Sequence, residues 1–332
     1  PLLWFFLGMA YLPLIATFQI ALPERVQPEG FALYLGTGAA ALALAALFLG
    51  YLLGGAGALP GLAIPVVTGL ALVVFGWLYL RPMIESLAEV LLWPMYRVSA
   101  TGPGLERFPM HGPVLVLGNH TSYLDPLFLS KHTPRPIIAI MTSRFYDMKL
   151  LRPLMKYVFR AIRVPERPVR REAPELKEAV AALDRGECFV IFPEGYLQRK
   201  DEPVLRRFAR GVWEILAARP NTPVIACWLE GGWGTYFSYK NGPPMTNKPM
   251  DWWVRIRVAY GEGERIPPEV LADHIRTRRY LMERCLQARE LLGLPPAEVP
   301  LPRVGEPAER EPEPVPPDPP DPAGPVEQPP SR

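Results

Sequence analysis

The stretch Val114–Leu129 reads Val-Leu-Val-Leu-Gly-Asn-His-Thr-Ser-Tyr-Leu-Asp-Pro-Leu-Phe-Leu. It opens as an apolar run of strand length and breaks at Gly118-Asn119. A helical pattern starts at Asp125-Pro126, because Asp favours helix N-caps and Pro favours the first helical turn. A buried strand that feeds a helix through a polar loop is a common place for α/β enzymes to carry reactive side chains. We therefore predict an α/β domain organised around this stretch.

His120 lies in the predicted loop, with Asp125 five residues further on. Five residues of helix turn through about 500°, so the two side chains would not share a face if both were helical. We therefore expect His120 in the loop, with the chain bending so that the carboxylate returns to it. Such a pair suits proton transfer, because the carboxylate fixes the tautomer of the imidazole. From this spacing alone Asp125 can equally be a plain helix cap.

Strand and helix patterns alternate along the rest of the chain. Predicted strands occupy residues 114–118, 136–140, 188–192, 223–229 and 253–260. Predicted helices occupy residues 126–131, 148–160, 173–185, 204–218 and 268–292. This alternation predicts a mixed, mostly parallel sheet flanked by helices, which forms a domain over residues 112–294.

Three uncharged apolar segments precede this domain, at residues 1–22, 31–54 and 57–80. Each reaches the roughly 20 residues that a helix needs to cross a bilayer. We therefore predict three transmembrane helices in residues 1–80. Residues 81–111 are predicted to connect them to the domain, with a helix at 83–96 that lies in the membrane interface or packs on the domain. Arg81 and Arg97 follow the third span and favour a multi-pass protein of the inner (cytoplasmic) membrane whose domain faces the cytoplasm.

The charge is unevenly distributed. The net charge of +3 combines +9 in residues 81–294 with −5 in residues 295–332 and −1 in residues 1–80, counted on the sequence. A basic body beside apolar spans predicts an anionic membrane surface or substrate, and no nucleic-acid motif is present. The last 38 residues contain 15 prolines, so they are predicted to be a disordered tail. The three cysteines and four histidines show no metal-ligand spacing, so no metal site is predicted.

A second motif follows about seventy residues after the first. Residues 188–195 read Cys-Phe-Val-Ile-Phe-Pro-Glu-Gly and place a carboxylate at the end of a buried strand. Alone, Pro193-Glu194-Gly195 is an ordinary turn. Together with Asn119-His120 and Asp125, it resembles the PlsC-type glycerolipid acyltransferases, which act on lysophosphatidate and other lysophospholipids. The resemblance covers roughly residues 95–262 and implies a glycerol-3-phosphate acyltransferase-like fold.

The resemblance implies a role for each matched residue. His120 resembles the general base for the acceptor hydroxyl and Asp125 its orienting partner, while Asn119, Glu194 and Gly195 resemble residues of the acceptor site. The family motif usually continues Gly-Thr-Arg, but here it runs Gly195-Tyr196-Leu197-Gln198-Arg199, which displaces the arginine by two residues. The candidate ligands of an acceptor phosphate are therefore Arg163, Arg167, Arg199 and Arg210. Arg199 is the first choice, because it lies in the loop right after Glu194, and Arg210 is the second.

The activity implied by the resemblance is transfer of a fatty acyl group from acyl-CoA or acyl carrier protein to the free hydroxyl of 1-acylglycerol-3-phosphate. The expected partners are membrane lipids, the lysophospholipid acceptor and the thioester donor, with no further cofactor. Residues 229–242 resemble enzymes that re-acylate 2-acylglycerophosphoethanolamine, so an acceptor with a head group is one alternative. The other is a non-catalytic remnant of a lysophospholipid transporter fusion, with residues 1–80 as the last transporter helices.

Overall fold

The computed structural model describes residues 80–81, 84–85, 87–165, 173–201 and 203–300. The three predicted transmembrane helices, apart from Leu80, lie outside these residues, as does most of the predicted tail. Within the described ranges, no helix combines the length and apolar character that crossing a membrane requires.

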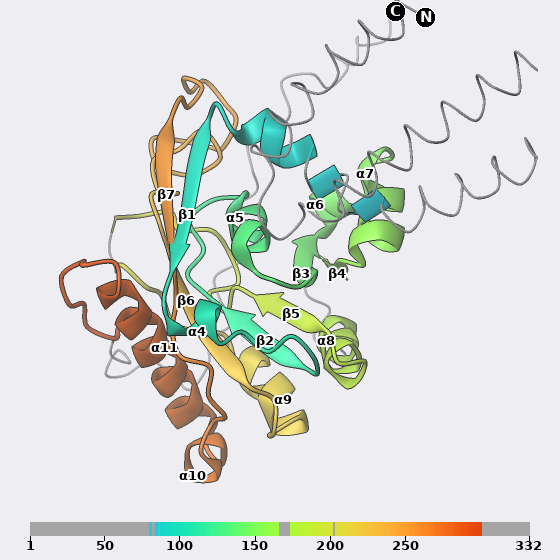
Figure 1. Cartoon of the computed structure of the whole chain (residues 1–332), viewed down its shortest axis with the longest axis vertical. Coiled ribbons are helices and arrows are strands. Elements are labelled where there is room, and N and C mark those ends of the chain that lie inside the picture. Colours follow the sequence, from blue (N-terminus) through green and yellow to red (C-terminus); the bar gives the residue numbers. More distant parts are fainter. Residues whose placement is uncertain (1–79, 82–83, 86, 166–172, 202, 301–332) are drawn as a thin grey trace, which may run out of the picture.

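Seven strands form one sheet in the order β1-β7-β6-β2-β5-β3-β4 (Figure 1). Their bounds are β1 Tyr96–Thr101, β2 Val114–Leu117, β3 Ile137–Thr142, β4 Ile162–Val164, β5 Cys188–Ile191, β6 Val224–Glu230 and β7 Val254–Tyr260. All neighbours are parallel except β6 and β7, which are antiparallel. The predicted α/β class with a mixed, mostly parallel sheet is therefore confirmed.

The single antiparallel pair determines what meets at each edge of the sheet. Because β7 and β1 run opposite to the other strands, they begin at the edge where β2, β5 and β6 end. Glu230, the last residue of β6, pairs with Arg257. Val254 to Ile256 therefore extend beyond the end of β6 and pair only with β1. The sheet edge that receives the polar loops after β2 and β5 thus also carries the N-terminal ends of β1 and β7.

Helices cover both faces of the sheet. Their bounds are α4 Pro103–Glu106, α5 Asp125–His132, α6 Ser143–Tyr146, α7 Leu151–Pro153, the π-helix η1 Leu154–Phe159, α8 Pro174–Asp184, α9 Gly211–Ala218, α10 Pro268–Leu271 and α11 His274–Glu290. Leu115 and Leu117 of β2 pack with α8, α9 and α11 in one cluster. Val114 and Val116 pack with α5 in another. Alternate residues of β2 thus enter opposite cores, which explains its continuous apolar sequence.

Three predicted helices were wrong in extent. The helix predicted at 204–218 begins only at Gly211, because the main-chain N–H groups of Arg206 and Ala209 bond to Glu194 and Pro193 instead. The helix predicted at 268–292 is two helices, since Asp273 caps α11 by accepting from Ile275 N and Arg276 N. The helix predicted at 148–160 is α7 followed by η1.

The domain also starts earlier than predicted. Residues 87–92 are helical, and the helix ends just before Pro94, close to the predicted end. Residues 81–111 are not only a connection, however, because they contain β1 and α4. Tyr96 to Thr101 pair along their whole length with β7, more than 150 residues away in the sequence. The sheet therefore begins at Tyr96 rather than near residue 112.

Candidate active site

The loop between β2 and α5 is built around the carboxylate of Asp125. This side chain is fully buried. Its Oδ2 accepts hydrogen bonds from the main-chain N–H of Thr121 at 2.7 Å, the N–H of Ser122 at 2.9 Å and Nδ1 of His120 at 2.9 Å. Asp125 is the first residue of α5, and the N-cap is Leu124. Its carboxylate therefore folds the loop back on itself and orients His120 at the same time, as the predicted bend of the chain requires.

The contacts of the His120 ring leave its nitrogen Nε2 able to accept a proton. Its ring stacks on Phe192, with 4.3 Å between ring centroids and 15° between the planes. The side chain is 18% exposed. With Nδ1 donating to the Asp125 carboxylate, Nε2 carries the lone pair. The described part of the chain offers Nε2 no hydrogen-bond partner. His120 can therefore accept a proton from a bound hydroxyl group.

Glu194 fixes the main chain of His120. It follows β5, and its Oε1 accepts from the His120 N–H at 2.9 Å. The His120 carbonyl in turn accepts from the Gln198 N–H at 2.8 Å. Burial raises the pKa of Glu194, while its hydrogen bonds and the Arg206 charge act in the opposite direction. Glu194 is therefore placed to position His120, and its predicted contact with the acceptor stays a prediction. Gly195 is exposed with φ +80°, a conformation that favours glycine in this turn.

Arg206 is the residue of this site that the sequence analysis missed. Its main-chain N–H and its Nε both donate to Oε2 of Glu194, at 3.2 and 3.4 Å. Its guanidinium also donates to the carbonyl of Tyr196 at 2.6 Å and stacks over the Tyr196 ring. The buried carboxylate thus has a cation beside it. Arg206 lies in a stretch with a helical sequence pattern, so only the tertiary contact with Glu194 reveals its role.

Asn119 was predicted to contact the acceptor, but its side chain serves the sheet. It is buried, with its amide nitrogen donating to the Leu229 carbonyl at 2.9 Å and its amide oxygen accepting from the Leu229 N–H at 2.8 Å. Both polar atoms are thereby used in extending the pairing of β2 with β6. Asn119 therefore positions the loop, and its predicted contact with the acceptor stays a prediction.

The structure separates the four candidate arginines. Arg199 lies over the ring of Tyr239, 4.5 Å from its centroid. That tyrosine neighbours Tyr123 in the loop between β2 and α5, residues 118–124, which we call the catalytic loop for its predicted role. Arg163 lies on β4, where its Nε donates to both oxygens of Asp147 at 3.0 Å. This pairing raises the pKa of Arg163.

Arg210, at the start of α9, pairs with Glu214 at 3.2 Å. Arg167 lies outside the described residues. Among the candidates, Arg199 is therefore the cation that the structure links to the catalytic loop through aromatic contacts.

Residues 229–242 pack directly against the catalytic loop. The Tyr123 N–H donates to the Phe237 carbonyl at 3.2 Å. Trp233 donates through Nε1 to Asp201, at 2.8 Å, and so joins this segment to the loop after β5. Gly232 lies closest, because a Cβ at this position would be 2.4 Å from Oγ1 of Thr121 and 3.3 Å from Oδ1 of Asp125. The segment therefore forms one wall of the site.

Gly232→Ala is expected to lower turnover at least about tenfold, because the added methyl group must displace the loop that holds Asp125 and misplace the catalytic base. The measurement is the steady-state rate of acyl transfer, with circular dichroism to confirm folding. Thr121→Ala removes the nearest clashing atom, so the double variant should recover part of the lost rate. A Gly232→Ala variant with the parent rate would show that the loop tolerates this displacement.

Residues 101–230 match the family model described as Acyltransferase. The matched range contains the loop of His120 and Asp125 as well as Glu194. Over this range, the match agrees with the acyltransferase resemblance that the two motifs predict.

Individual relatives match only part of this chain and part of their own length. Uncharacterized proteins of Mycobacterium tuberculosis and Mycobacterium bovis are 28% identical over 157 residues, which is 45% of this chain and 41% of theirs. An N-acylphosphatidylethanolamine synthase of Arabidopsis thaliana is 26% identical over 165 residues, covering 45% of this chain and 55% of the plant protein. The chain thus spans about half the length of the curated relatives it matches.

A crystal structure of the 1-acyl-sn-glycerophosphate (LPA) acyltransferase PlsC from Thermotoga maritima aligns with a TM-score of 0.48 and 19% identity. The alignment covers 66% of this chain and 82% of the bacterial one.

Proposed function

We propose that this protein is a membrane-bound acyltransferase that moves a fatty acyl group from acyl-CoA or acyl carrier protein to the free hydroxyl of 1-acylglycerol-3-phosphate. The observation that carries the proposal is the His120–Asp125 pair, joined at 2.9 Å and presenting Nε2 without a partner among the described residues. The family match over residues 101–230 supports acyl transfer as the reaction. A non-catalytic transporter remnant is disfavoured, because His120, Asp125 and Glu194 form one connected site.

The geometry supports a direct transfer without a covalent acyl-enzyme. Nε2 of His120 takes the proton of the acceptor hydroxyl as its oxygen attacks the thioester carbonyl carbon, and a tetrahedral intermediate forms. The carbon–sulfur bond then breaks, and the departing thiolate takes the proton from the imidazolium. Asp125 stabilises the positive charge that His120 carries between these steps. The products are the ester and the free thiol of the donor carrier.

The proposed location is the inner (cytoplasmic) membrane, with the catalytic domain facing the cytoplasm. Its support is the sequence, in which residues 1–22, 31–54 and 57–80 are apolar and uncharged. Both proposed substrates carry negative charge, which suits the net +9 of residues 81–294 counted on the sequence. No cofactor is proposed beyond the thioester, because the acyl group arrives already activated.

Release of free thiol from acyl-CoA by the purified full chain, dependent on an added lysophospholipid, is the decisive test. The expected result is stoichiometric formation of thiol and acylated lipid. The donor is also offered as acyl carrier protein, because a strict requirement for one carrier would otherwise appear as inactivity. Absence of acceptor-dependent thiol release with both donors would contradict the proposed function.

A second acceptor class is favoured by two observations. Residues 229–242, whose sequence resembles enzymes that act on a head-group-bearing lysophospholipid, form a wall of the site. The Arabidopsis relative is named for a product in which ethanolamine carries the added acyl group. The acceptor panel should therefore include 1-acylglycerol-3-phosphate, 2-acylglycerophosphoethanolamine and phosphatidylethanolamine. The acceptor with the highest kcat/KM identifies the class.

Arg199→Ala is expected to raise the KM for 1-acylglycerol-3-phosphate at least about tenfold while leaving the donor KM nearly unchanged. A charge-assisted hydrogen bond to a phosphate is worth about 1.5–3 kcal/mol, and the structure gives Arg199 a ring contact but no carboxylate partner among the described residues. Arg163→Ala is the matched control, since Arg163 is already paired with Asp147. Equal acceptor KM values in the two variants would show that Arg199 does not bind the acceptor phosphate.

A further inference from the structure

Two tryptophans and an arginine form an exposed cluster near the start of β1 and β7, and the exposed Trp252 is adjacent to it in the sequence. Trp93 and Trp253 meet edge to face, with ring centroids 5.4 Å apart. The Arg97 guanidinium lies over both rings, 4.2 and 4.3 Å from their centroids. Trp252 is 65% exposed and Trp253 52%. We call Trp93, Arg97, Trp252 and Trp253 the aromatic–arginine patch.

The backbone holds this patch open to solvent. The Trp253 N–H donates to the Pro94 carbonyl at 3.0 Å, which ties together the two segments that carry the rings. Trp253 has a φ of +58°, a left-handed conformation that is unfavourable for a bulky residue. An aromatic side chain that is both strained and exposed has little value for folding alone. Such strain is often found where a side chain serves a function.

The patch lies on the catalytic edge of the sheet. β1 and β7 begin at the edge where β2 and β5 end, and β7 extends three residues beyond its pairing with Glu230 of β6. The exposed apolar side chains Leu87 and Leu91 lie on the helix that leads into the patch. Met148 and Leu150, also exposed, follow the end of β3. Exposed apolar side chains therefore lie at the sheet edge that carries His120.

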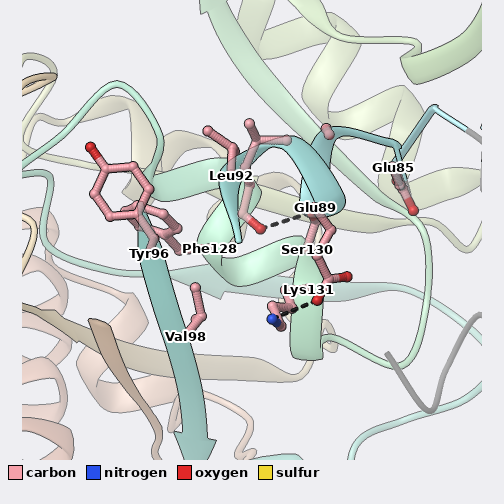
Figure 2. A pocket seen from close by; sticks show the side chains of 10 residues that line it. Glu85, Glu89, Leu92, Tyr96, Val98, Phe128, Ser130 and Lys131 are labelled. Atoms are coloured by element: carbon pink, nitrogen blue, oxygen red, sulfur yellow. Dashed lines mark hydrogen bonds and ion pairs between the residues drawn. The ribbon is translucent and has the colours of Figure 1, made fainter. Parts of the chain in front are cut away.

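A rigid connection joins the patch to the catalytic helix. Figure 2 shows the pocket between residues 84–98 and α5, in which Glu89 forms an ion pair with Lys131. Tyr96 packs edge to face against Phe128 of α5, at 5.3 Å between centroids. Since α5 begins with Asp125, any surface that binds the patch is held at a fixed position relative to the catalytic loop.

The composition and the charge of the patch identify its partner. Tryptophan is enriched at the boundary between lipid head groups and acyl chains, and arginine binds lipid phosphates. Arg97 and its cross-strand neighbour Arg255 have no carboxylate partner among the described residues. The segment that precedes this region, residues 57–80, is uncharged and apolar. These features fit a phospholipid surface better than a protein partner, which would pair the two arginines with acids.

We propose that the aromatic–arginine patch binds the head-group region of an anionic phospholipid bilayer, so that the catalytic edge faces the membrane. This interaction surface is separate from the predicted transmembrane helices. It does not require acyl transfer, so its test can fail without affecting the proposed function.

The test measures the depth of a probe at residue 252 in vesicles. The three native cysteines are buried, so a thiol label on the full-length Trp252→Cys variant is selective. The variant is reconstituted into vesicles of phosphatidylcholine and phosphatidylglycerol, and a nitroxide label reports collisions with oxygen in the lipid phase and with an aqueous nickel complex. Ile275→Cys on α11 is the matched control, because Ile275 is apolar and 53% exposed but lies away from the patch.

The expected result is a ratio of lipid-phase to aqueous collisions at residue 252 at least about fivefold higher than at residue 275, as for an interfacial side chain. Equal ratios at the two positions would overturn the proposal. So would a residue-252 label that neither reagent reaches, since protein would then cover the patch, or dipolar broadening between labels, which would indicate a second copy of the chain. Leu91→Cys provides a second position if Trp252→Cys folds poorly.

Discussion

His120→Ala is expected to lower kcat for acyl transfer by about 10²–10⁴, which is the usual contribution of a general base. The reason is geometric, because Nε2 of His120 has no hydrogen-bond partner among the described residues and is therefore placed to receive a proton. The KM for the donor should change little, since the imidazole acts on the acceptor hydroxyl. The measurement is single-turnover and steady-state thiol release from acyl-CoA.

The fold should survive this change. The main-chain N–H and carbonyl of His120 keep their hydrogen bonds to Glu194 and Gln198 in the alanine variant. The stacking on Phe192 and the Nδ1 hydrogen bond to Asp125 are lost, but the Asp125 carboxylate still accepts from the N–H groups of Thr121 and Ser122. Such an aromatic contact is worth about 0.5–1.5 kcal/mol. His111→Ala is the matched control, because His111 is exposed and, within the described part of the chain, forms no hydrogen bond or ion pair with the loop of His120. Activity of His120→Ala within a few-fold of the parent would exclude His120 as the base.

Asp125→Asn is expected to lower kcat by about 10²–10⁴ as well, because a neutral amide no longer stabilises the imidazolium or enforces the tautomer with the lone pair on Nε2. Asparagine is chosen over alanine for a structural reason. Alanine would leave the buried N–H groups of Thr121 and Ser122 without an acceptor, at about 1–3 kcal/mol each. The amide oxygen can still accept from them, so Asn separates the chemical effect from unfolding.

The double variant His120→Ala, Asp125→Asn tests whether the two residues act as a unit. If Asp125 acts only through the imidazole, removing both should cost little more than removing His120 alone. Thermal unfolding of all three variants should be recorded alongside the rates. A double variant slower than His120→Ala by the full factor of the Asp125→Asn effect would show that the carboxylate has an independent role.

The sequence alone was sufficient for the central part of the fold and for the reactive pair. β2 and β5 have continuous apolar sequences because both of their faces are buried, and each ends at a polar motif that interrupts the pattern. The motif residues His120 and Asp125 are five positions apart, so a local bend is enough to bring them together. The predicted strands therefore agree with the observed β2, β3, β5, β6 and β7 to within one or two residues.

Contacts between segments far apart in the sequence determined the remaining parts of the fold. β1 is an edge strand with alternating polar residues, and only its pairing with β7 makes it part of the sheet. The sequence before α9 has a helical pattern, yet the buried Glu194 carboxylate draws the main chain and side chain of Arg206 to itself. Desolvating a carboxylate is costly enough to override local helix propensity.

The side chains around the reactive pair were likewise assigned by tertiary structure. Asn119 belongs to the recognised motif, but its amide completes the pairing with Leu229, 110 residues away. The position of Arg199 just after Glu194 made it the first candidate, and the packed fold adds that Arg163 pairs with Asp147 whereas Arg199 lies over the ring of Tyr239. Local sequence determined the positions of His120 and Asp125 in a loop after a strand, because strand and loop patterns depend on a few neighbouring residues. Burial and charge compensation, which depend on the packed fold, decided which neighbours support them.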